Sequence, residues 1–310
     1  MSQNILVIKL GALGDFIQAG GPFATIREYH NRAFITLLTS QPFAEFAARS
    51  PWFDEVWVDQ KPKIYQLGMW LNLRTRLRDH NFECVYDLQT SERSNLYFKL
   101  YWPDQAPDWS GIAKGCSYPH SNPNRDFMHT IDRQAEQLVM AGLPSPSKPD
   151  FSWVEGDVSR FNLRSPYALI APGGAIHRQD KRWPVQKFRE LSGLLDDQGI
   201  QSVVIGTCDE VGLGNSIVNN LRIGLNLAGQ TSLEDLFQLA RDATYAIGND
   251  TGPMHLISNQ GCESIVLYSE ASNPNLCAQR GSNVTIIRRD NLESLIVEDV
   301  VKALSNTHPA

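Results

Sequence analysis

The sequence AIGNDTGPMHL at residues 246–256 joins the end of an apolar run to a tight turn and the first turn of a helix. Pro253 fits that first turn because its missing N–H needs no partner there, and Asp250 or Thr251 can serve as the N-cap. Gly252 lets the backbone approach a bound group closely. The free amides at such a helix start form a natural binding site for phosphate. The stretch therefore predicts a strand, a turn and a helix that together suit a phosphorylated ligand.

Apolar runs alternate with helical patterns on both sides of this stretch. One run, at residues 4–10, opens the first half of the chain, and another, at 167–171, opens the second. A proline-rich segment at 144–149 separates the two halves. Repeated strand–helix alternation predicts two doubly wound, Rossmann-like α/β domains, which we place at residues 1–150 and 151–310.

Glycine-rich turns follow strands in both halves, at residues 11–15 (GALGD) and at 248–252. Ligands bind open α/β sheets outside the carboxyl ends of the strands. We therefore expect the two turns to line a cleft between domains that face each other. The first turn is not a dinucleotide-binding GxGxxG motif, and it is not a P-loop because no GK[ST] follows it.

The spacing of apolar residues predicts the positions of the remaining elements. Helices are expected at residues 16–30, 41–49, 65–80, 125–142, 185–198, 210–221, 232–242, 254–260 and 292–304. Ser232 is predicted to cap its helix, with Asp235 in the capping-box position. The segment 102–123 is rich in Pro, Trp, Gly and Ser and is predicted to be mostly loop.

Composition narrows the functional class. The chain is 42% hydrophobic and 20% charged, which is typical of a globular protein, and its net charge of −6 argues against general nucleic-acid binding. Its five cysteines are odd in number and widely spaced, so neither a disulfide framework nor a zinc site is indicated. The apolar run at 5–10 is too short for a signal peptide or a membrane span. We expect a cytoplasmic location.

Asp15 has two readings. It follows a Gly-x-x-Gly turn at a junction between strand and helix, where an aspartate commonly caps the helix. It could instead be a carboxylate placed to take a proton from a hydroxyl group. The two roles are compatible only if one carboxylate oxygen stays free.

Lys181 and Glu210 also have two readings each. Lys181 stands beside Arg182 at the entrance to a helix, so it is either half of a solvated basic pair or a cation that neutralises a departing diphosphate. Glu210 follows the strand at 201–205. It either accepts hydrogen bonds from a ribose or, as an acidic residue in the first turn of a helix, interacts favourably with the helix dipole.

The turn at 173–174 strengthens the hypothesis that residues 248–255 bind phosphate. Gly173 and Gly174 follow another strand of the same half, so two glycine-rich loops would converge on one ligand. The alternative is a capped helix start with a buried Met254 and a hydrogen-bonded His255.

Positive charge gathers in the first half of an otherwise acidic chain. The basic residues concerned are Arg74, Arg76, Arg78, Arg93, Lys99 and Lys114. They form either a solvated surface or a binding surface for an anionic acceptor.

Three motifs resemble those of the lipopolysaccharide heptosyltransferases, glycosyltransferase family nine. They are NILVIKLGALGD at residues 4–15, KRWP at 181–184 and GNDTGPMHL at 248–256, in the order found in that family. YDLQ at 86–89, followed by Arg93, is also similar. The resemblance covers nearly the whole chain.

The resemblance implies a GT-B fold, with the acceptor bound by the domain at 1–150 and the nucleotide-sugar donor by the domain at 151–310. It implies inverting transfer of a heptose from ADP-L-glycero-D-manno-heptose to the lipopolysaccharide inner core, with no cofactor and no obligatory metal. The partners would be the nucleotide sugar and a lipid-linked core oligosaccharide, with peripheral contact at the cytoplasmic face of the inner membrane and no nucleic acid.

The resemblance also assigns roles to individual residues. Asp15 matches the catalytic base. The donor-binding set is Gly173, Gly174, Lys181, Glu210, Asp250, Thr251, Gly252 and His255. The acceptor-binding set is Gly14, Gln89 and Arg93.

One departure from the family concerns the donor phosphates. The sequence GGAIHRQD at 173–180 lacks a Ser/Thr pair that some heptosyltransferases use, and the amide of Gly174, His177 or Arg178 would have to replace it. Two other functions stay open. One is a GT-B enzyme that uses another nucleotide sugar or acceptor, and the other is a sugar-phosphate binding module without catalysis.

Overall fold

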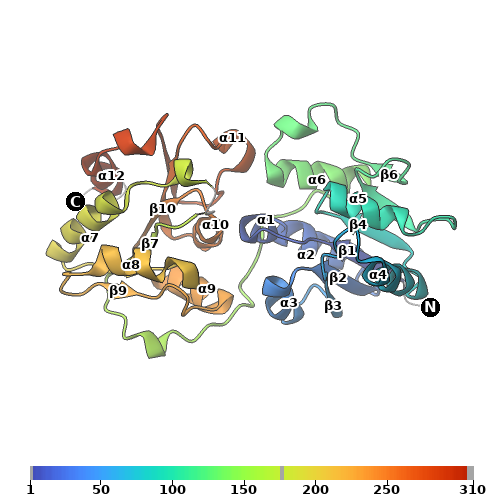
Figure 1. Cartoon of the computed structure of the whole chain (residues 1–310), viewed down its shortest axis with the longest axis horizontal. Helices are drawn as coiled ribbons and strands as arrows, with labels where there is room; N and C mark the ends of the chain where they lie inside the picture. Colours follow the sequence, from blue (N-terminus) through green and yellow to red (C-terminus); the bar gives the residue numbers. More distant parts are fainter. Residues whose placement is uncertain (1–2, 175–177, 306–310) are drawn as a thin grey trace. The chain divides into compact units, whose positions relative to one another are not determined.

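The computed structural model describes residues 3–174 and 178–305 and divides into two compact units, Met1–Trp153 and Val154–Ala310. Each unit is built on its own six-stranded sheet, in which every paired strand is parallel to its neighbours (Figure 1). Helices connect successive strands, as parallel pairing requires. The predicted class, two doubly wound α/β domains, is confirmed.

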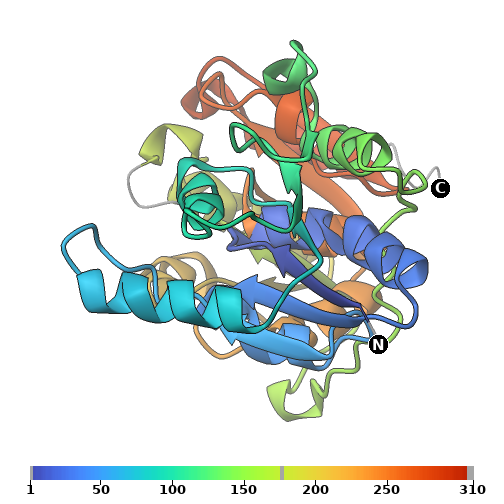
Figure 2. The same ribbon diagram turned by 90° about the vertical axis from the view of Figure 1, so that its right-hand side faces the viewer.

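The first unit has the strand order β3-β2-β1-β4-β5-β6, and its first three strands lie side by side in Figure 2. Its elements are β1 (Asn4–Ile8), α1 (Leu13–Gln18), α2 (Gly20–Tyr29), β2 (Phe34–Thr39), α3 (Gln41–Ala48), β3 (Glu55–Val58), α4 (Leu67–Asp79), β4 (Cys84–Asp87), α5 (Glu92–Lys99), β5 (Asp108–Gly111), β6 (Tyr118–Pro119), η1 (Arg125–Phe127) and α6 (Thr130–Met140). The chain reverses its direction of winding at β1, which pairs with both β2 and β4.

The second unit has the strand order β12-β11-β10-β7-β8-β9. Its elements are η2 (Ser159–Phe161), β7 (Tyr167–Ala171), η3 (Gln179–Lys181), α7 (Val185–Asp197), β8 (Gln201–Val204), η4 (Cys208–Glu210), α8 (Val211–Val218), β9 (Leu225–Asn226), α9 (Leu233–Asp242), β10 (Tyr245–Asn249), α10 (Gly252–Asn259), β11 (Glu263–Tyr268), α11 (Pro274–Cys277), β12 (Val284–Arg288), η5 (Leu292–Ser294) and α12 (Val297–Ser305). Winding reverses here between β7 and β10.

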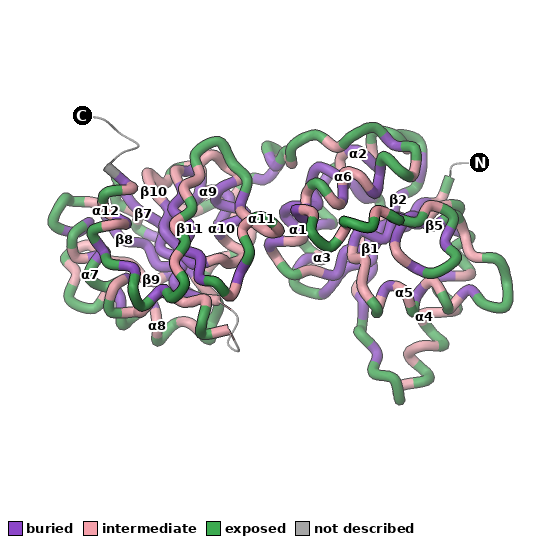
Figure 3. The backbone as a smooth tube through the Cα atoms, turned by 90° about the horizontal axis from the view of Figure 1, so that it is seen from above, coloured by how far each residue is buried: buried purple, intermediate pink, exposed green. Residues whose placement is uncertain are grey.

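The central strands form the buried part of each unit (Figure 3). Ile5, Leu6, Val7 and Ile8 of β1 are fully buried, which explains the continuous apolar run of a strand covered on both faces. Helix α4 turns one face to the core, where Leu77 is buried and Trp70 and Leu73 pack against it.

The single helix predicted at 16–30 is wrong, because α1 ends at Gln18 and α2 begins at Gly20. Gly20 and Gly21 cause the break by allowing another segment to approach. A Cβ on Gly21 would lie 2.2 Å from the carbonyl oxygen of Ser147. Pro22 then fits the first turn of the new helix, where no N–H is needed.

The segment at 102–123 is mostly loop, as predicted, but it also contains two strands that were not predicted, β5 and β6. Both strands are short, and Gly and Pro residues obscure their pattern, but Trp109 of β5 is fully buried and completes the core. The helices predicted at 125–142 and 292–304 each begin with a separate 3₁₀ turn. Helix α5 and strand β12 were not predicted.

The predicted capping box of α9 is confirmed. The Ser232 hydroxyl accepts from the Asp235 amide at 3.1 Å, and the Ser232 amide donates to the Asp235 carboxylate at 2.7 Å.

We expect Ser232→Ala to lower the free energy of unfolding by about 1 kcal/mol, because two amides at the helix start lose a reciprocal arrangement. Urea unfolding measures this change. Ser216→Ala in α8 is the control, since the Ser216 hydroxyl only donates back to the Gly212 carbonyl. It should change stability by no more than about 0.5 kcal/mol. Equal effects of the two substitutions would contradict the capping role.

Candidate functional site

The residues selected from sequence lie where strand order reverses in each sheet. In the first unit, residues 9–15 follow β1 and residues 88–93 follow β4, its neighbour. In the second unit, residues 172–174 follow β7 and residues 250–255 follow β10. Loops diverge at such a reversal and leave room for a ligand at the carboxyl edge of the sheet. Each unit therefore carries one candidate half-site.

Asp15 lies in the first turn of α1 and is half-buried. The N-cap of α1 is Ala12, so the reading of Asp15 as an N-cap is wrong. No residue in the described part of the chain forms a hydrogen bond with its side chain. Its carboxylate therefore keeps both oxygens available for a ligand.

The turn before Asp15 depends on glycine. Gly11 has φ +113°, and a Cβ there would lie 2.6 Å from the Phe43 ring. Gly14 is buried within α1, where its carbonyl accepts from the Gln18 side chain at 3.3 Å. Gly14 thus contributes to the support of Asp15 through its backbone.

A buried lysine, Lys9, interacts electrostatically with both Asp15 and the buried Asp87. Lys9 donates from Nζ to the Leu88 carbonyl at 3.0 Å. Burial lowers the pKa of Lys9, while the charges of Asp15 and Asp87 act in the opposite direction. Asp87 accepts from the amides of Gln89 and Thr90 through one oxygen, and its other oxygen is buried without a hydrogen-bond partner. Burial raises the pKa of Asp87 to about 6 despite these donors.

We expect this shift to make the protein less stable as the pH rises. The native pKa of Asp87 lies above its unfolded value of about 4, so the native state holds a proton between pH 4 and 6 that the unfolded state has lost. Relative to Asp87→Asn, the wild-type protein should lose about 3 kcal/mol between pH 4 and pH 7, from about two pKa units. Measurements of the free energy of unfolding at several pH values test this difference.

The control is Asp79→Asn, which changes an exposed carboxylate at the end of α4 and should show the wild-type dependence of stability on pH. A wild-type slope in Asp87→Asn would contradict the assignment.

Gln89 and Arg93 take different positions in the first half-site. Gln89 accepts from the Leu10 amide at 2.8 Å and so joins the ends of β1 and β4. Arg93 donates to the Pro62 carbonyl and contacts the Tyr97 hydroxyl, each at 3.4 Å, which directs it toward the β3–α4 connection. Arg125 was not selected from sequence, yet it donates to the Thr90 hydroxyl at 2.6 Å and adds a cation to this edge.

Asp250 is the centre of the second half-site. Its carboxylate accepts from Lys181 Nζ (3.0 Å), the Tyr268 hydroxyl (2.9 Å), the Ser272 hydroxyl (2.7 Å) and Gln279 Nε2 (3.2 Å). Burial alone would raise its pKa, but the Ser272 hydrogen bond and the Lys181 charge outweigh burial, and the pKa falls below its usual value. The charged carboxylate fixes Lys181 at this edge of the sheet.

Thr251, Gly252 and His255 surround the start of α10. Thr251 is the N-cap residue, but its side chain makes no capping hydrogen bond, and its buried hydroxyl has no hydrogen-bond partner in the part of the chain that the structure describes. Gly252 is the first residue of the helix, and His255 lies buried one turn later. Buried hydroxyls are nearly always hydrogen-bonded, so this one is a candidate ligand contact.

Gly173 and Gly174 form the other wall of the second half-site. A Cβ on Gly174 would lie 3.7 Å from Thr251 Cγ2, so the two loops are in contact. Arg182 donates from one terminal nitrogen to the Gly174 carbonyl, and its buried Nε has no hydrogen-bond partner among residues 3–174 and 178–305. No separate role was predicted for Arg182, although it stands next to Lys181.

Glu210 is bound to this wall. One oxygen accepts from the Gly174 amide at 3.1 Å, and the other accepts from the Thr207 amide at 2.8 Å. A Cβ on Gly173 would lie 2.0 Å from the carboxylate. Glu210 therefore positions the glycine turn. The contact of Glu210 with a ribose stays a prediction.

Asn249 links three segments and was not selected from sequence. It is fully buried, accepts from the Trp183 amide at 2.9 Å and donates to the Pro172 carbonyl at 2.8 Å. A polar residue at the end of a buried strand is the signal that could have identified it. Arg178 donates to the Ala271 carbonyl at 2.6 Å, while His177 lies outside the described residues.

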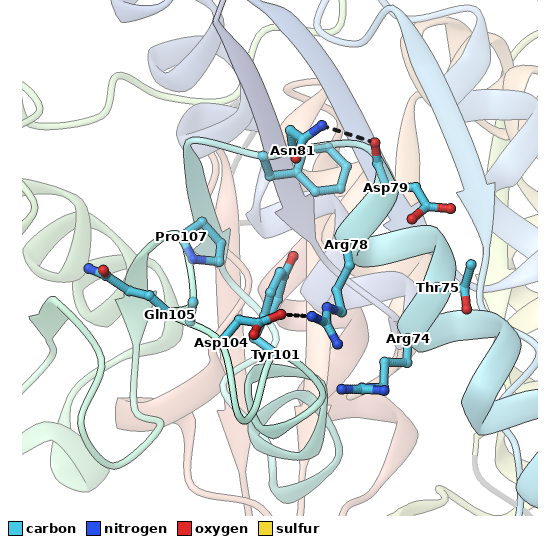
Figure 4. Close-up of a pocket in the computed structure, with 11 residues that line it drawn as sticks. Arg74, Thr75, Arg78, Asp79, Asn81, Tyr101, Asp104, Gln105 and Pro107 are labelled. Atoms are coloured by element: carbon cyan, nitrogen blue, oxygen red, sulfur yellow. Dashed lines mark hydrogen bonds and ion pairs between the residues drawn. The ribbon is translucent and has the colours of Figure 1, made fainter.

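A separate cavity lies away from both half-sites. It has a volume of about 670 Å³ in the first unit and is lined by Arg74, Arg78, Asn81, Tyr101, Asp104 and Pro107, among others (Figure 4). Asn81 precedes β4 and Pro107 precedes β5, so the cavity is at the amino edge of the sheet, opposite Asp15. Arg78 is paired there with Asp104. The cavity has no part in either half-site.

Each half-site supplies groups suited to one part of a transfer from a phosphate ester. Lys181 and the amides at the start of α10 can stabilise negative charge on a leaving phosphate. The carboxylate of Asp15 can accept a proton from a hydroxyl group.

Among the described residues, no helix is both long and apolar enough to cross a membrane.

Comparison with known proteins agrees with this chemistry. The family model described as glycosyltransferase family 9 (heptosyltransferase) matches residues 70–303. Lipopolysaccharide heptosyltransferase 1 of Escherichia coli K12 is 30% identical over 246 residues, which cover 75% of each chain. Lipopolysaccharide heptosyltransferase 2 of the same strain is 24% identical over 298 residues, 87% of this chain and 84% of that protein. The solved structure of the E. coli heptosyltransferase WaaC with ADP-2-deoxy-2-fluoro heptose has a TM-score of 0.77 at 18% identity, covering 99% of this chain and 100% of that one.

Proposed function

Because the chain belongs to glycosyltransferase family 9, the heptosyltransferase family, we propose that it transfers a heptose from ADP-L-glycero-D-manno-heptose to the inner core of lipopolysaccharide. Both compared E. coli proteins are lipopolysaccharide heptosyltransferases, and the solved structure contains an ADP-heptose analogue. The chain is a glycosyltransferase by family. The donor, the acceptor and the inverting course of the reaction are our proposal.

The observation that carries the proposal is the second half-site. Lys181 stands at the carboxyl edge of β7 and β10, and the Thr251 hydroxyl and Arg182 Nε nearby are buried without partners. Unsatisfied buried donors are costly, and a diphosphate would satisfy both. The amides at Gly252 and the helix dipole favour the same anion.

The proposed mechanism assigns the proton transfer to Asp15. Its carboxylate takes the proton from an acceptor hydroxyl, and the acceptor oxygen attacks the anomeric carbon from the side opposite the diphosphate, so the configuration inverts. The carbon–oxygen bond to the diphosphate breaks as the new bond forms. Lys181 and the α10 amides stabilise the departing diphosphate, and His255 assists by hydrogen bonding. A diphosphate is a good leaving group, so the mechanism requires neither a general acid nor a metal.

The first half-site is the proposed acceptor side. Gly14 precedes Asp15 in α1, Gln89 follows β4 and Arg93 lies in the first turn of α5. Arg125 adds positive charge that suits an anionic core oligosaccharide. Because the acceptor would be carried on a lipid, we propose peripheral contact with the cytoplasmic face of the inner membrane.

A donor panel tests the proposal. Purified protein is incubated with lipid-linked inner core and with ADP-heptose or ADP-, GDP- and UDP-linked hexoses, in buffer that contains EDTA. We expect ADP release and a mass gain of one heptose with ADP-heptose alone. Transfer from another nucleotide sugar would identify a different glycosyltransferase. Donor binding without turnover on any acceptor would identify a binding module.

A further inference from the structure

The connection between β3 and α4 ends in exposed apolar side chains. Ile64 is 86% exposed, Tyr65 74%, Leu67 69% and Leu71 60%, and we call these four residues the apolar tip. Single exposed apolar residues are ordinary on a protein surface, but a group within one short segment marks an interaction site. Figure 3 shows this connection as a largely exposed excursion of the chain.

The core of the unit does not account for these side chains. Leu77 of α4 is buried, and Trp70 and Leu73 pack against the same core. Leu67 and Leu71 are four residues apart and therefore share a different face of the helix. The helical part of the apolar tip, Leu67 and Leu71, thus lies on the side of α4 that the core leaves uncovered, and Ile64 and Tyr65 precede the helix.

The charge around the apolar tip is opposite to that of the whole chain. Residues 60–78 contain five basic residues and no acidic residue, although the net charge of the chain is −6. The five are Lys61, Lys63, Arg74, Arg76 and Arg78. Three of these are engaged by the unit itself. Arg74 donates to backbone carbonyls, Arg76 stacks on Trp57, and Arg78 pairs with Asp104.

The two lysines beside the tip keep their charge available. Among the described residues, no carboxylate pairs with Lys61 or Lys63, and Lys63 Nζ lies 5.9 Å from the centre of the Tyr65 ring. An apolar segment flanked by free lysines suits an anionic interface in which apolar groups can also be buried.

The apolar tip adjoins the proposed acceptor side of the unit. It follows β3 at the carboxyl edge of the sheet, the same edge as Asp15. The Tyr97 hydroxyl donates to Asp59 at 2.7 Å, and Arg93 donates to the Pro62 carbonyl. Helix α5 therefore contacts the first residues of the loop, at positions 59 and 62. Figure 2 shows the loop before α4 projecting away from the sheet.

We propose that the apolar tip, with Lys61 and Lys63, docks the first unit on a bilayer rich in anionic lipids. The apolar side chains enter the interface between headgroups and acyl chains, and the lysines remain among the headgroups. This inference rests on the proposed function, because docking at a membrane would serve transfer to a lipid-linked acceptor. A tip inserted beside the acceptor side would present Asp15 to a hydroxyl carried on a lipid.

Vesicle binding by the full chain tests the docking directly. Wild-type protein is sedimented with vesicles of phosphatidylethanolamine and phosphatidylglycerol, and with vesicles of phosphatidylcholine alone. We expect binding to the anionic vesicles that weakens as salt is raised, and much weaker binding to the neutral ones.

Two variants separate the apolar and the charged contributions. Ile64→Ser/Tyr65→Ser/Leu67→Ser should lower the partition coefficient at least about tenfold, since three apolar side chains lose their burial. Lys61→Glu/Lys63→Glu should lower it about thirtyfold or more at low salt. Leu194→Ser and Lys302→Glu change exposed residues of the second unit and should bind as wild type. Circular dichroism checks that every variant is folded.

The outcomes distinguish this proposal from the proposed function. Absence of wild-type binding to anionic vesicles, or unchanged binding by the triple-serine variant, would overturn the docking. The docking would also be overturned if the wild-type protein bound no vesicles but formed a dimer in ultracentrifugation, and the triple-serine variant were monomeric. The apolar tip would then be a dimer interface. Sedimentation requires no donor, so vesicle binding together with failed heptose transfer would leave the docking intact and overturn the function alone.

Discussion

Asp15→Asn should lower kcat by about two to four orders of magnitude, the usual effect of removing a general base. Asparagine has nearly the same size, and no described side chain depends on the Asp15 carboxylate for a hydrogen bond, so the fold should be retained. Donor affinity should change little, because the groups assigned to the donor phosphates belong to the second unit. Initial rates of ADP release, with ADP affinity from calorimetry, separate the two quantities.

A matched control distinguishes the base from a merely structural acid. Glu298 is an exposed acidic residue in the first turn of α12, as Asp15 is an acidic residue in the first turn of α1. A carboxylate at such a position interacts favourably with the helix dipole, by about 0.3–1 kcal/mol. Glu298→Gln should therefore cost similar stability but leave kcat unchanged. Near-normal turnover by Asp15→Asn at unchanged donor affinity would show that the base lies elsewhere.

Lys181→Ala should weaken donor binding and turnover together, with a loss of about a hundredfold or more in kcat/KM. A charge-assisted contact to a buried phosphate contributes roughly 1.5–3 kcal/mol in binding alone, and the developing charge on the leaving group adds to this in the transition state. Steady-state kinetics at varied ADP-heptose and fixed acceptor measures the change. Calorimetric titration with ADP measures the binding component.

The alternative is that Lys181 serves only to neutralise Asp250. The carboxylate would retain three donors from Tyr268, Ser272 and Gln279 in the variant, so folding should survive. Lys187→Ala is the control, because Lys187 at the start of α7 donates to the carbonyls of Glu293 and Leu295. That variant should lose stability but keep its donor KM. A Lys181→Ala protein with lowered stability and wild-type kinetics would remove Lys181 from the donor site.

Local sequence patterns were enough for most elements because they encode backbone conformation directly. Tyr167–Ala171 forms the predicted strand, and Ser232 and Asp235 form the predicted capping box. Prediction failed where a distant segment decides the local structure. Gly20 and Gly21 interrupt a helical pattern because the chain near Ser147 approaches them, and β5 is a strand because Trp109 fills the core.

The candidate site divides in the same way. The motifs identified Asp15, Lys181 and residues 250–255, since glycine-rich turns and first-turn residues are local features. They did not reveal the pairing of Lys181 with Asp250, which comes from residues far apart in sequence. They also gave no sign that Glu210 is held by the Gly174 amide.

By itself, the sequence determined the class of fold, the edges of the sheets where ligands bind and the residue types available there, because alternation and turn chemistry are properties of neighbouring residues. Only the tertiary structure decided what each of these residues contacts. Sheet order brings β7 beside β10 and β1 beside β4. This order fixes four donors around Asp250 and brings Lys9 close enough to interact with both Asp15 and Asp87. Charge state and hydrogen bonding depend on distance and burial, which long-range strand pairing sets and local sequence does not.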